Sequence, residues 1–532
     1  MAIAKNPILS GFYPDPSICA VGDDFYLVNS TFSYFPGIPI MHSKNLAHWE
    51  QIGNVMDRES QLPLYGCGHS EGLFAPTIRY HEGVFYVICT NVSGGGNFIV
   101  TATDPAGPWS EPYYLPEAAG IDPSLFFDED GTCYYIGTHP NPKGCRYDGD
   151  WFIWIQELDL KSMRLVGEAK DVWNGAMRHV VWPEGPHLYK KDGYYYILHA
   201  EGGTEFRHAV AVCRSRNIWG PYENDACNPI LTHRHLGRSY PVQCVGHGDL
   251  VETPAGEWYM AALAVRPLEG HTTLGRETFL ARVVWEDGWP VVNPGIGRLT
   301  DTVEIGLAGW KPGVPERADI VYDFTAMDRL GDVFLFLRNP DPGSYSLCAG
   351  EGLKLSYGGC ALTRKESPAY VGLRQRHHHF RAEVFMILPV CGSQGEAGIA
   401  LVQSNEYHLR LALTRDEASQ AVQIRVYLCE QGVDRRIAGQ TMTVPQEDAD
   451  GGVALTLSLE VRGLVAAASV SAGFGETKLV EGVDIRSLST ETAGGFVGCT
   501  VGLYAAGGDD KNTNVIFKKL TYSEIKEKDD AE

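Results

Sequence analysis

A carboxylate near the start of the chain lies between two prolines, in Tyr13-Pro14-Asp15-Pro16-Ser17. Proline fixes its own φ and biases the preceding residue towards extended conformations, so we expect Asp15 to have little backbone freedom. On its own, such an Asp predicts no more than a turn. Similar phrases recur four times, however, and the residues that stand in the position of Asp15 are Ala75, Asp122, Glu184 and His247.

Three carboxyl groups in one register could hydrolyse a glycosidic bond. This reaction takes a carboxylic acid on the leaving oxygen and a carboxylate about 6.5–9.5 Å away that activates water, or about 5–5.5 Å away if it attacks the sugar itself. The sequence does not give this distance. Burial against the nearby Trp182 would raise the pKa of Glu184 and suit it to be the acid, whereas Asp15 would stay ionised as the base. Asp122 would raise the pKa of the acid by charge repulsion and hold it in orientation.

Other side chains near these motifs could bind a sugar. Arg276 could direct its guanidinium at sugar hydroxyls or at a catalytic carboxylate, with a salt bridge to the adjacent Glu277 or to another acid as the structural alternative. Phe32 and Phe74 could present a ring face to a sugar or pack in the core. His247 could orient a carboxylate, hydrogen-bond the sugar or bind a divalent metal ion.

The motifs belong to a repeat that predicts a five-bladed β-propeller. Each motif is followed, after 11 to 13 residues, by an aromatic residue of a β-rich strand, at positions 26, 86, 135, 196 and 259. A hydrophobic strand, a hairpin turn and an aromatic strand form the first half of a propeller blade. Because blades pack radially, we expect the five motif positions to converge at the central channel. The segment Asn6–Leu9 is expected to close the ring by pairing with the fifth blade.

The length of 532 residues exceeds what one hydrophobic core usually organises, so we expect two domains. We assign residues 1–305 to the propeller and the Gly- and Pro-rich residues 306–320 to a linker. Alternating strands with regularly spaced turns over residues 321–525 predict a β-sandwich of the concanavalin-like jelly-roll type. Residues 526–532 form a charged tail. The predicted fold class is all-β.

Composition limits the partners of the chain. The net charge of −22 disfavours nucleic acid and anionic membranes, so a neutral oligosaccharide is the expected partner. Thirteen cysteines without a C-x-x-C pair indicate free thiols in a reducing compartment. The N-terminal residues lack the apolar run of a secretory signal, and no later segment is long and apolar enough to span a bilayer. We therefore expect a cytoplasmic protein with no membrane partner, and we leave open whether it forms a homo-oligomer.

A set of motifs carries a resemblance to a known family. The segments are Asn6-Pro7-Ile8, Tyr13-Pro14-Asp15-Pro16-Ser17, Ser30-Thr31-Phe32, Phe35-Pro36-Gly37, Gly120-Ile121-Asp122-Pro123-Ser124, Glu184-Gly185-Pro186-His187, Gly246-His247-Gly248-Asp249, Gly495-Phe496-Val497-Gly498 and Gly502-Leu503-Tyr504-Ala505. They resemble glycoside hydrolase family 43, and within it the two-domain β-xylosidase and α-L-arabinofuranosidase branch. The resemblance covers nearly the whole chain.

The resemblance implies roles for the motif residues. It implies an inverting mechanism with Asp15 as general base, Glu184 as general acid and Asp122 as modulator of the pKa of the acid. It also implies that Arg276 contacts the sugar in the terminal subsite and that Phe32 lines this subsite.

The resemblance also bears on the roles of three further residues. A loop of the second domain near Phe496 is implied to close the pocket. In some relatives a channel histidine, here His247, takes part in calcium binding, although no cofactor is expected to be required. Phe74 stands where many relatives have Trp, which alters one wall of the pocket, so the sequence does not decide between xylose and arabinofuranose.

We therefore predict an exo-acting, inverting glycosidase of xylan degradation. It would release terminal β-D-xylosyl or α-L-arabinofuranosyl residues from hemicellulose-derived oligosaccharides. Two alternatives are a non-catalytic glycan-binding propeller and a retaining, five-bladed fructosidase-like enzyme. The presence of all three carboxyl groups argues against the first alternative.

Overall fold

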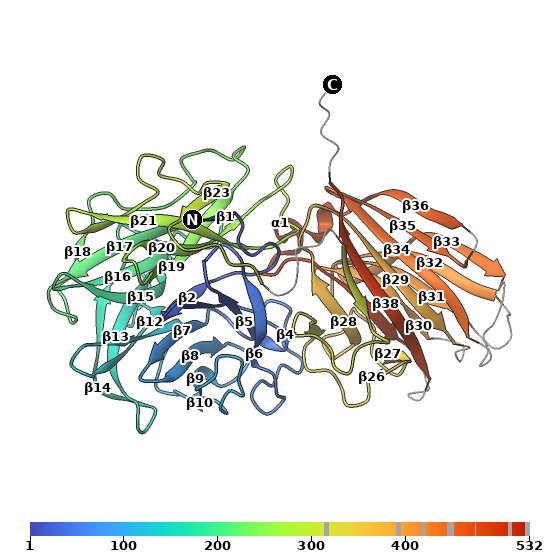
Figure 1. The fold of residues 1–532 in the computed structure, drawn as a ribbon, viewed down its shortest axis with the longest axis horizontal. Coiled ribbons are helices and arrows are strands. Elements are labelled where there is room, and N and C mark those ends of the chain that lie inside the picture. Colours follow the sequence, from blue (N-terminus) through green and yellow to red (C-terminus); the bar gives the residue numbers. More distant parts are fainter. Residues whose placement is uncertain are drawn as a thin grey trace.

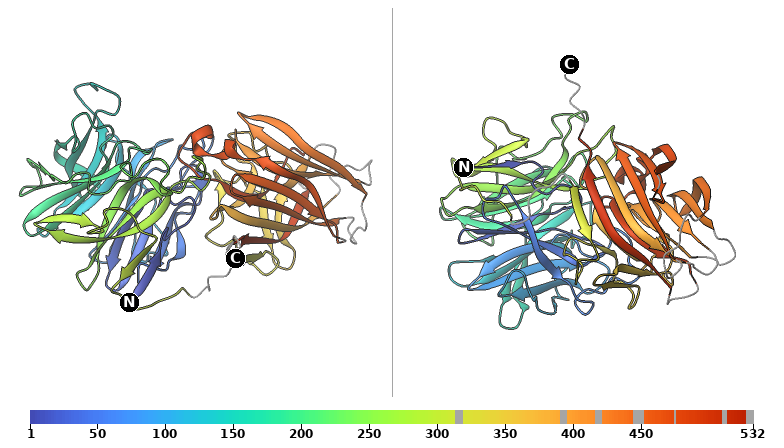
Figure 2. Two further views of the ribbon diagram at one scale, coloured as in Figure 1. Left: turned by 90° about the horizontal axis from the view of Figure 1, so that it is seen from above. Right: turned by 45° about the vertical axis from the view of Figure 1, so that its right-hand side comes forward.

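The computed structural model describes residues 1–312, 319–389, 395–415, 421–443, 452–473, 475–508 and 513–526. Nearly all regular structure in these residues is β-strand, and it forms two domains that lie side by side (Figures 1 and 2). The predicted all-β class is confirmed. None of the helices in the described ranges is long and apolar enough to cross a membrane.

Five four-stranded antiparallel sheets form the first domain. The first two blades contain β2 (Ser17–Val21), β3 (Asp24–Val28), β5 (Gly37–Ser43) and β6 (Glu50–Met56), then β7 (Thr77–His81), β8 (Val84–Asn91), β9 (Gly96–Ala102) and β10 (Tyr113–Tyr114). The third contains β11 (Ile121–Phe127), β12 (Cys133–Pro140), β13 (Trp151–Asp159) and β14 (Arg164–Trp173). The last two contain β15 (Glu184–Lys191), β16 (Tyr194–Glu201), β17 (Ala209–Ser215) and β18 (Glu223–Asn224), then β19 (Gln243–Glu252), β20 (Trp258–Val265), β21 (Glu277–Glu286) and β22 (Trp289–Val292).

The sequence repeat matches the blades strand for strand. The aromatic residues at positions 26, 86, 135, 196 and 259 all lie on the second strand of a blade. The first strands of the blades contact one another around the centre. The predicted propeller is therefore confirmed, and the motif residues, which lie in or just before these first strands, lie next to the channel.

The N-terminus closes the ring. Strand β1 (Ala2–Lys5) pairs with β23 (Thr302–Ile305), and Leu9 forms a bridge with Thr278 of β21. The pairing of Leu9 with the fifth blade agrees with the expectation, whereas the pairing of β1 with β23 was not predicted.

The second domain is a β-sandwich. One sheet contains β24 (Asp319–Asp323), β26 (Tyr345–Cys348), β27 (Gly352–Ser356), β38 (Asn514–Glu524), β29 (His379–Leu388), β34 (Val453–Arg462), β35 (Val465–Ser471) and β36 (Glu476–Asp484). The other contains β28 (Ala369–Arg374), β37 (Thr500–Ala506), β30 (Glu396–Val402), β31 (His408–Thr414), β32 (Ala421–Glu430) and β33 (Val433–Thr443). Alternate residues of β29 are buried, as expected for a strand with one face on the core.

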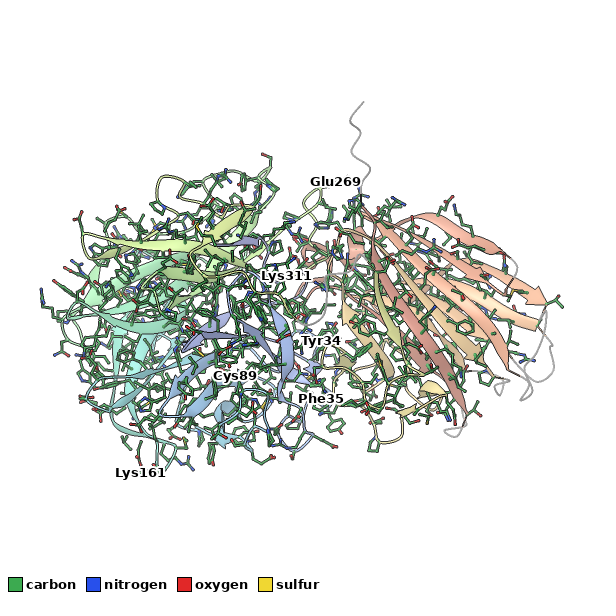
Figure 3. The ribbon with its side chains drawn as sticks, viewed as in Figure 1. Tyr34, Phe35, Cys89, Lys161, Glu269 and Lys311 are labelled. Carbon is green, nitrogen blue, oxygen red and sulfur yellow. The ribbon has the colours of Figure 1, made fainter. Side chains whose placement is uncertain are left out.

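The two domains share a hydrophobic core. Strand β4 (Tyr34–Phe35) of the propeller pairs with β25 (Phe336–Leu337) of the sandwich, and Tyr34 and Phe35 lie at this junction in Figure 3. Buried side chains of both domains pack in one cluster that includes Phe12, Tyr34 and Tyr504. Such an interface is expected to hold the domains in a fixed relation.

The predicted domain boundaries remain predictions. Residues 313–318 of the predicted linker, and all of the predicted charged tail except Lys526, lie outside the described residues. The last propeller strand, β23, ends at Ile305 and the first sandwich strand, β24, begins at Asp319.

Removal of residues 1–5 should destabilise the propeller. Ala2 and Ala4 are buried, and loss of β1 leaves the backbone groups of β23 without partners, so we expect the free energy of unfolding to fall by about 2 kcal/mol or more. Thermal unfolding measures the change. Ile3→Ala is the matched control, because Ile3 is 58% exposed and its loss should have little effect. An unchanged midpoint in the truncated chain would show that β1 does not close the ring.

Candidate active site

Asp15 lies in the loop that joins β1 to β2, and hydrogen bonds hold its backbone in a strained conformation. The carbonyl of Pro14 accepts hydrogen bonds from the Asn29 side chain at 2.9 Å and from the Ser30 amide at 3.3 Å. The following proline led us to expect an extended backbone at Asp15. The structure instead gives Asp15 a φ of +51°. A non-glycine residue in this region is unusual and marks a site where the surrounding structure determines the backbone.

β-Bulges place the other motif residues. The register against the next strand shifts at Asp122 in β11, after Glu184 in β15 and on both sides of Gly246 in β19. A bulge bends a strand and re-aims a side chain, and bulges are common beside active sites. Asp122 and His247 also have positive φ values of +53° and +45°. The same device therefore recurs in three blades.

Asp15 forms a buried ion pair with Arg276. Nη1 of Arg276 lies 2.7 Å from Oδ1 of Asp15, and Nη2 lies 3.3 Å from Oδ2. The Ser30 hydroxyl donates to Oδ2 at 2.6 Å, and Nδ1 of His247 lies 3.8 Å from Oδ1. Burial raises the pKa of Asp15, but Arg276, His247 and Ser30 together lower it by more, so the net pKa lies below its usual value. Asp15 is therefore ionised.

The structure shows which acidic group Arg276 contacts. Its guanidinium contacts a candidate catalytic carboxylate, whereas Glu277 pairs with Arg266, at 2.7 Å between Nε and Oε2. The salt bridge between Arg276 and Glu277 is thus not present.

The pKa values of Asp122 and Glu184 are raised, whereas that of Asp15 is lowered. Burial raises the pKa of Asp122 to about 6, although His247 lowers it and the amide of Gly185 donates a hydrogen bond to Oδ2 at 3.2 Å. Burial, reinforced by the negative charges of Asp122 and Asp15, raises the pKa of Glu184 well above its usual value. The pKa values of Glu184 and Asp15 are thus shifted in opposite directions, and two such carboxyl groups can serve as a general acid and a general base.

Aromatic side chains from both domains surround the ion pair. Phe32 contacts Phe74 edge to face with ring centroids 5.3 Å apart, and it stacks on Phe496 at 5.8 Å. The guanidinium carbon of Arg276 lies 5.7 Å from the ring centre of Phe32 and 5.6 Å from that of Phe496. The sandwich therefore contributes Phe496 to the site. Phe74 and Phe496 are half-buried and Phe32 is buried.

A contact between two glycines brings Phe496 to Arg276. Gly275 has a φ of +76°, and a Cβ atom there would lie 2.7 Å from the amide nitrogen of Gly498. Only glycine permits this approach of the two backbones. The amide of Cys499 also donates to the carbonyl of Thr273 at 2.8 Å. The residues before Arg276 and after Phe496 are thus fixed to each other.

The structure brings together all the predicted site residues. Contacts connect Asp15, Arg276, His247, Phe32, Phe74 and Phe496, and the charges of Asp15, Asp122 and Glu184 affect one another. Ala75, at the equivalent position of the second blade, is buried and has no polar group. The motif that contains Ser30 does not by itself predict the hydrogen bond from Ser30 to Asp15.

Sequence reasoning missed a second polar layer in the channel. Arg79 donates to both oxygens of Asp249, at 2.8 and 3.2 Å, and lies 3.0 Å from Nδ1 of His187. Ser17 donates to Asp249 at 2.7 Å, and Ser124 lies 3.1 Å from Nδ1 of His187. Four of these residues follow a motif position by two or three residues, so the repeat contained the signal. Arg79 lies four residues after Ala75.

The residues around His247 do not fit a calcium ion. Calcium prefers six to eight oxygen ligands, usually with several carboxylates. Asp15 and Asp249 are each bound by an arginine. Glu184, whose pKa is raised well above its usual value, is a poor ligand when protonated. Asp122 is the one remaining carboxyl group of the set, and it supplies far fewer oxygens than calcium prefers. We therefore derive no catalytic step through a metal ion.

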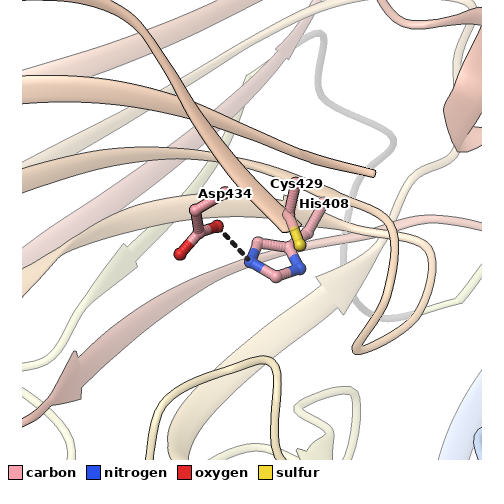
Figure 4. Close-up of side chains that lie close together, drawn as sticks. All are labelled: His408, Cys429 and Asp434. Carbon is pink, nitrogen blue, oxygen red and sulfur yellow. Dashed lines mark ion pairs between the residues drawn. The ribbon is translucent and has the colours of Figure 1, made fainter. Parts of the chain in front are cut away.

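Within the described part of the chain, metal-type ligands also gather in the sandwich, at His408, Cys429 and Asp434 (Figure 4). Nε2 of His408 lies 4.0 Å from Oδ1 of Asp434. Arg410 binds both oxygens of Asp434 and also donates to Glu396 at 2.9 Å. The carboxylate is therefore already neutralised, and the group is an arginine-centred ion-pair cluster.

Comparisons with known proteins identify the family of both domains. Residues 4–290 match the model of "Glycosyl hydrolases family 43", and residues 321–523 match "Beta xylosidase C-terminal Concanavalin A-like domain". A "Xylosidase/arabinosidase" of Butyrivibrio fibrisolvens is 51% identical over 99% of this chain and 100% of its own. A "Non-reducing end alpha-L-arabinofuranosidase" of Bacteroides ovatus is 38% identical over 96% of this chain and 92% of its own. The crystal structure of a xylan β-1,4-xylosidase of Bacillus halodurans superposes with a TM-score of 0.89 at 34% identity, over 98% of this chain and 100% of that one.

The ion pair predicts the pH dependence of turnover. In Arg276→Leu the pKa of Asp15 should rise, so activity should be lost at a higher pH as the solution is acidified. Ser30→Ala should shift the same acidic limb in the same direction but less, because the ion pair remains. Arg276→Leu should also lower the free energy of unfolding by about 3–5 kcal/mol, because it leaves a buried carboxylate unpaired.

The pH profile of kcat/KM on a 4-nitrophenyl glycoside measures both shifts. The alkaline limb is the internal control for Ser30→Ala, because Ser30 contributes to the pKa of Asp15 and not to that of Glu184. An acidic limb that stays in place in both variants would mean that Asp15 is not the ionised group on which activity depends.

Proposed function

The chain belongs to glycosyl hydrolases family 43, and on this basis we propose that it is an exo-acting, inverting glycosidase that removes terminal xylosyl or arabinofuranosyl units. The predicted family and enzyme class are confirmed by the matching family model and by relatives that align over 100% and 92% of their own length. The observation that carries the mechanism is the contrast between Asp15, ionised by Arg276, and Glu184, protonated beside it.

In the proposed mechanism Glu184 is the general acid and Asp15 the general base. Glu184 donates its proton to the glycosidic oxygen as the bond to the anomeric carbon breaks. Asp15 takes a proton from a water molecule, whose oxygen attacks the same carbon from the opposite face. The sugar leaves with inverted configuration, Glu184 ends ionised and Asp15 ends protonated. Exchange of one proton with solvent restores both groups.

Asp122 and Arg276 set the protonation states that this mechanism needs. The charge of Asp122 raises the pKa of Glu184 and keeps its proton in place at neutral pH. Arg276 keeps Asp15 ionised, and each carboxylate oxygen has lone pairs left to accept from water. We propose that Arg276 also donates to a sugar hydroxyl, since its Nε has no partner among the described residues.

The terminal sugar is proposed to bind beside Phe32, Phe74 and Phe496. Aromatic rings pack against the apolar face of a sugar, and these three come from both domains. The names of the relatives include xylosidase, arabinosidase and non-reducing end α-L-arabinofuranosidase, which supports exo action on pentose residues. Xylan-derived oligosaccharides are the proposed source of the substrate.

We further propose that the protein acts in the cytoplasm. The twelve cysteines among the described residues are all free, which suits a reducing compartment. The charge of −22 supports a neutral glycan as partner in preference to nucleic acid or an anionic membrane.

Hydrolysis of two aryl glycosides tests the function. The protein should hydrolyse 4-nitrophenyl β-D-xylopyranoside or 4-nitrophenyl α-L-arabinofuranoside, and a chelator should not change the rate because no step uses a metal. Proton NMR should show the inverted anomer as the first product. No turnover would favour a glycan-binding propeller, and a retained anomer would favour a fructosidase-like mechanism.

Replacement of Glu184 tests the assignment of the acid. Glu184→Ala should lose about 10²–10⁴-fold in kcat/KM on a natural disaccharide, which needs protonation of the leaving oxygen. It should lose much less on an aryl glycoside with a very good leaving group. Asp15→Asn is the matched comparison and should lose activity on both substrates. An equal loss on both substrates in Glu184→Ala would show that another residue is the acid.

A further inference from the structure

A small cavity lies between the two domains, away from the carboxyl groups of the channel. Its polar lining comes from Tyr13 of the propeller and from Tyr322, Arg374, Arg376 and Tyr522 of the sandwich. The volume is about 50 Å³, whereas one water molecule needs about 10–15 Å³. The cavity therefore has room for a small ion or a few water molecules, but not for a sugar.

Arg374 is buried in this cavity wall, and none of the described residues serves as its counterion. It is 4% exposed, and its Nε donates to the carbonyl of Phe12 at 2.7 Å. Its Nη2 is buried and has no hydrogen-bond acceptor, and no carboxylate of the described residues lies within ion-pair distance of the guanidinium. A buried charge without a partner costs folding free energy, so such groups are normally paired.

Other buried arginines of the chain show which partners usually compensate the buried positive charge. Arg276 pairs with Asp15, and Arg410 pairs with Asp434. Arg338, which is 1% exposed, uses Nε, Nη1 and Nη2 to donate to the carbonyls of Cys67 and Glu366 and to the side chain of Asn405. Arg374 differs from all three, because among the described residues only its Nε has an acceptor.

A second guanidinium adds to the positive charge. Arg376 is exposed, lines the same cavity and forms no ion pair within the described ranges. Burial raises the pKa of Tyr322 to about 12, so its hydroxyl stays protonated and able to donate. Oε2 of Glu524 lies 4.0 Å from Nε2 of His377, and no acidic residue is among the described lining residues of the cavity. The cavity thus holds two arginines that form no ion pair with a described residue, in a chain with a net charge of −22.

We propose that this cavity binds a small oxyanion, such as inorganic phosphate or a short carboxylate, through Arg374 and Arg376. A guanidinium presents parallel N–H donors that match the oxygens of phosphate and carboxylate groups. The ring of Tyr13 covers Arg374, with 4.3 Å between the guanidinium carbon and the ring centre. Tyr13 and Phe12 lie two and three residues before Asp15, so the anion braces the segment that carries Asp15 against the sandwich.

Calorimetric titration of the full chain with phosphate, with acetate and with chloride, at one ionic strength, tests the proposal. Phosphate or acetate should bind with saturation and raise the midpoint of thermal unfolding more than chloride does. The anion that binds more tightly identifies the source of the oxyanion. Equal effects of all three salts would overturn the proposal, because general salt effects act without a specific site.

Two variants and a control locate the binding. Arg376→Ala should weaken the affinity about tenfold or more, because it removes charge-assisted hydrogen bonds from an exposed residue that the fold does not need. Arg282→Ala, which removes an exposed arginine of β21, should bind like the parent chain. Arg374→Met should abolish binding, and if it does not fold, Arg376→Ala decides the outcome. Equal affinity in Arg376→Ala and Arg282→Ala would overturn the proposal.

Discussion

The ion pair between Asp15 and Arg276 is the interaction on which the site depends. Two buried carboxyl groups, Asp15 and Asp122, and the half-buried Glu184 lie close enough to affect one another, and desolvation alone would raise the pKa of each. Arg276 reverses this effect at Asp15, and the resulting negative charge raises the pKa of Glu184 further. One arginine thus separates a base from an acid within a single cluster.

The fold brings Arg276 into place through both domains. Arg276 precedes β21 of the last blade and meets Asp15 of the first, 261 residues away in the sequence. The close contact of Gly275 with Gly498 then sets Phe496 of the sandwich beside the guanidinium. A closed propeller and a docked sandwich are therefore both needed for the same ion pair, which gives the second domain a part in the chemistry.

Much of the fold could be predicted because each blade repeats the same short signals. Aromatic residues such as Tyr135 and Tyr259 fell on the second strands, since strand patterning and turns are local properties of the sequence. Strands of two residues, such as β4 and β25, have no such pattern and form only through pairing between the domains.

Side-chain partners in the site are equally non-local, so the choice of Arg276 between Asp15 and Glu277 could not be made from the sequence. The positive φ of Asp15 opposes the usual effect of a following proline and is fixed by tertiary hydrogen bonds.

The most direct test of the account is the protonation state of Glu184 and Asp15 in the free enzyme at neutral pH. Infrared difference spectra against Glu184→Gln and Asp15→Asn separate the carbonyl stretch of a protonated carboxyl group from the bands of a carboxylate. The account predicts a protonated Glu184 and an ionised Asp15. An ionised Glu184, or a protonated Asp15, would contradict it.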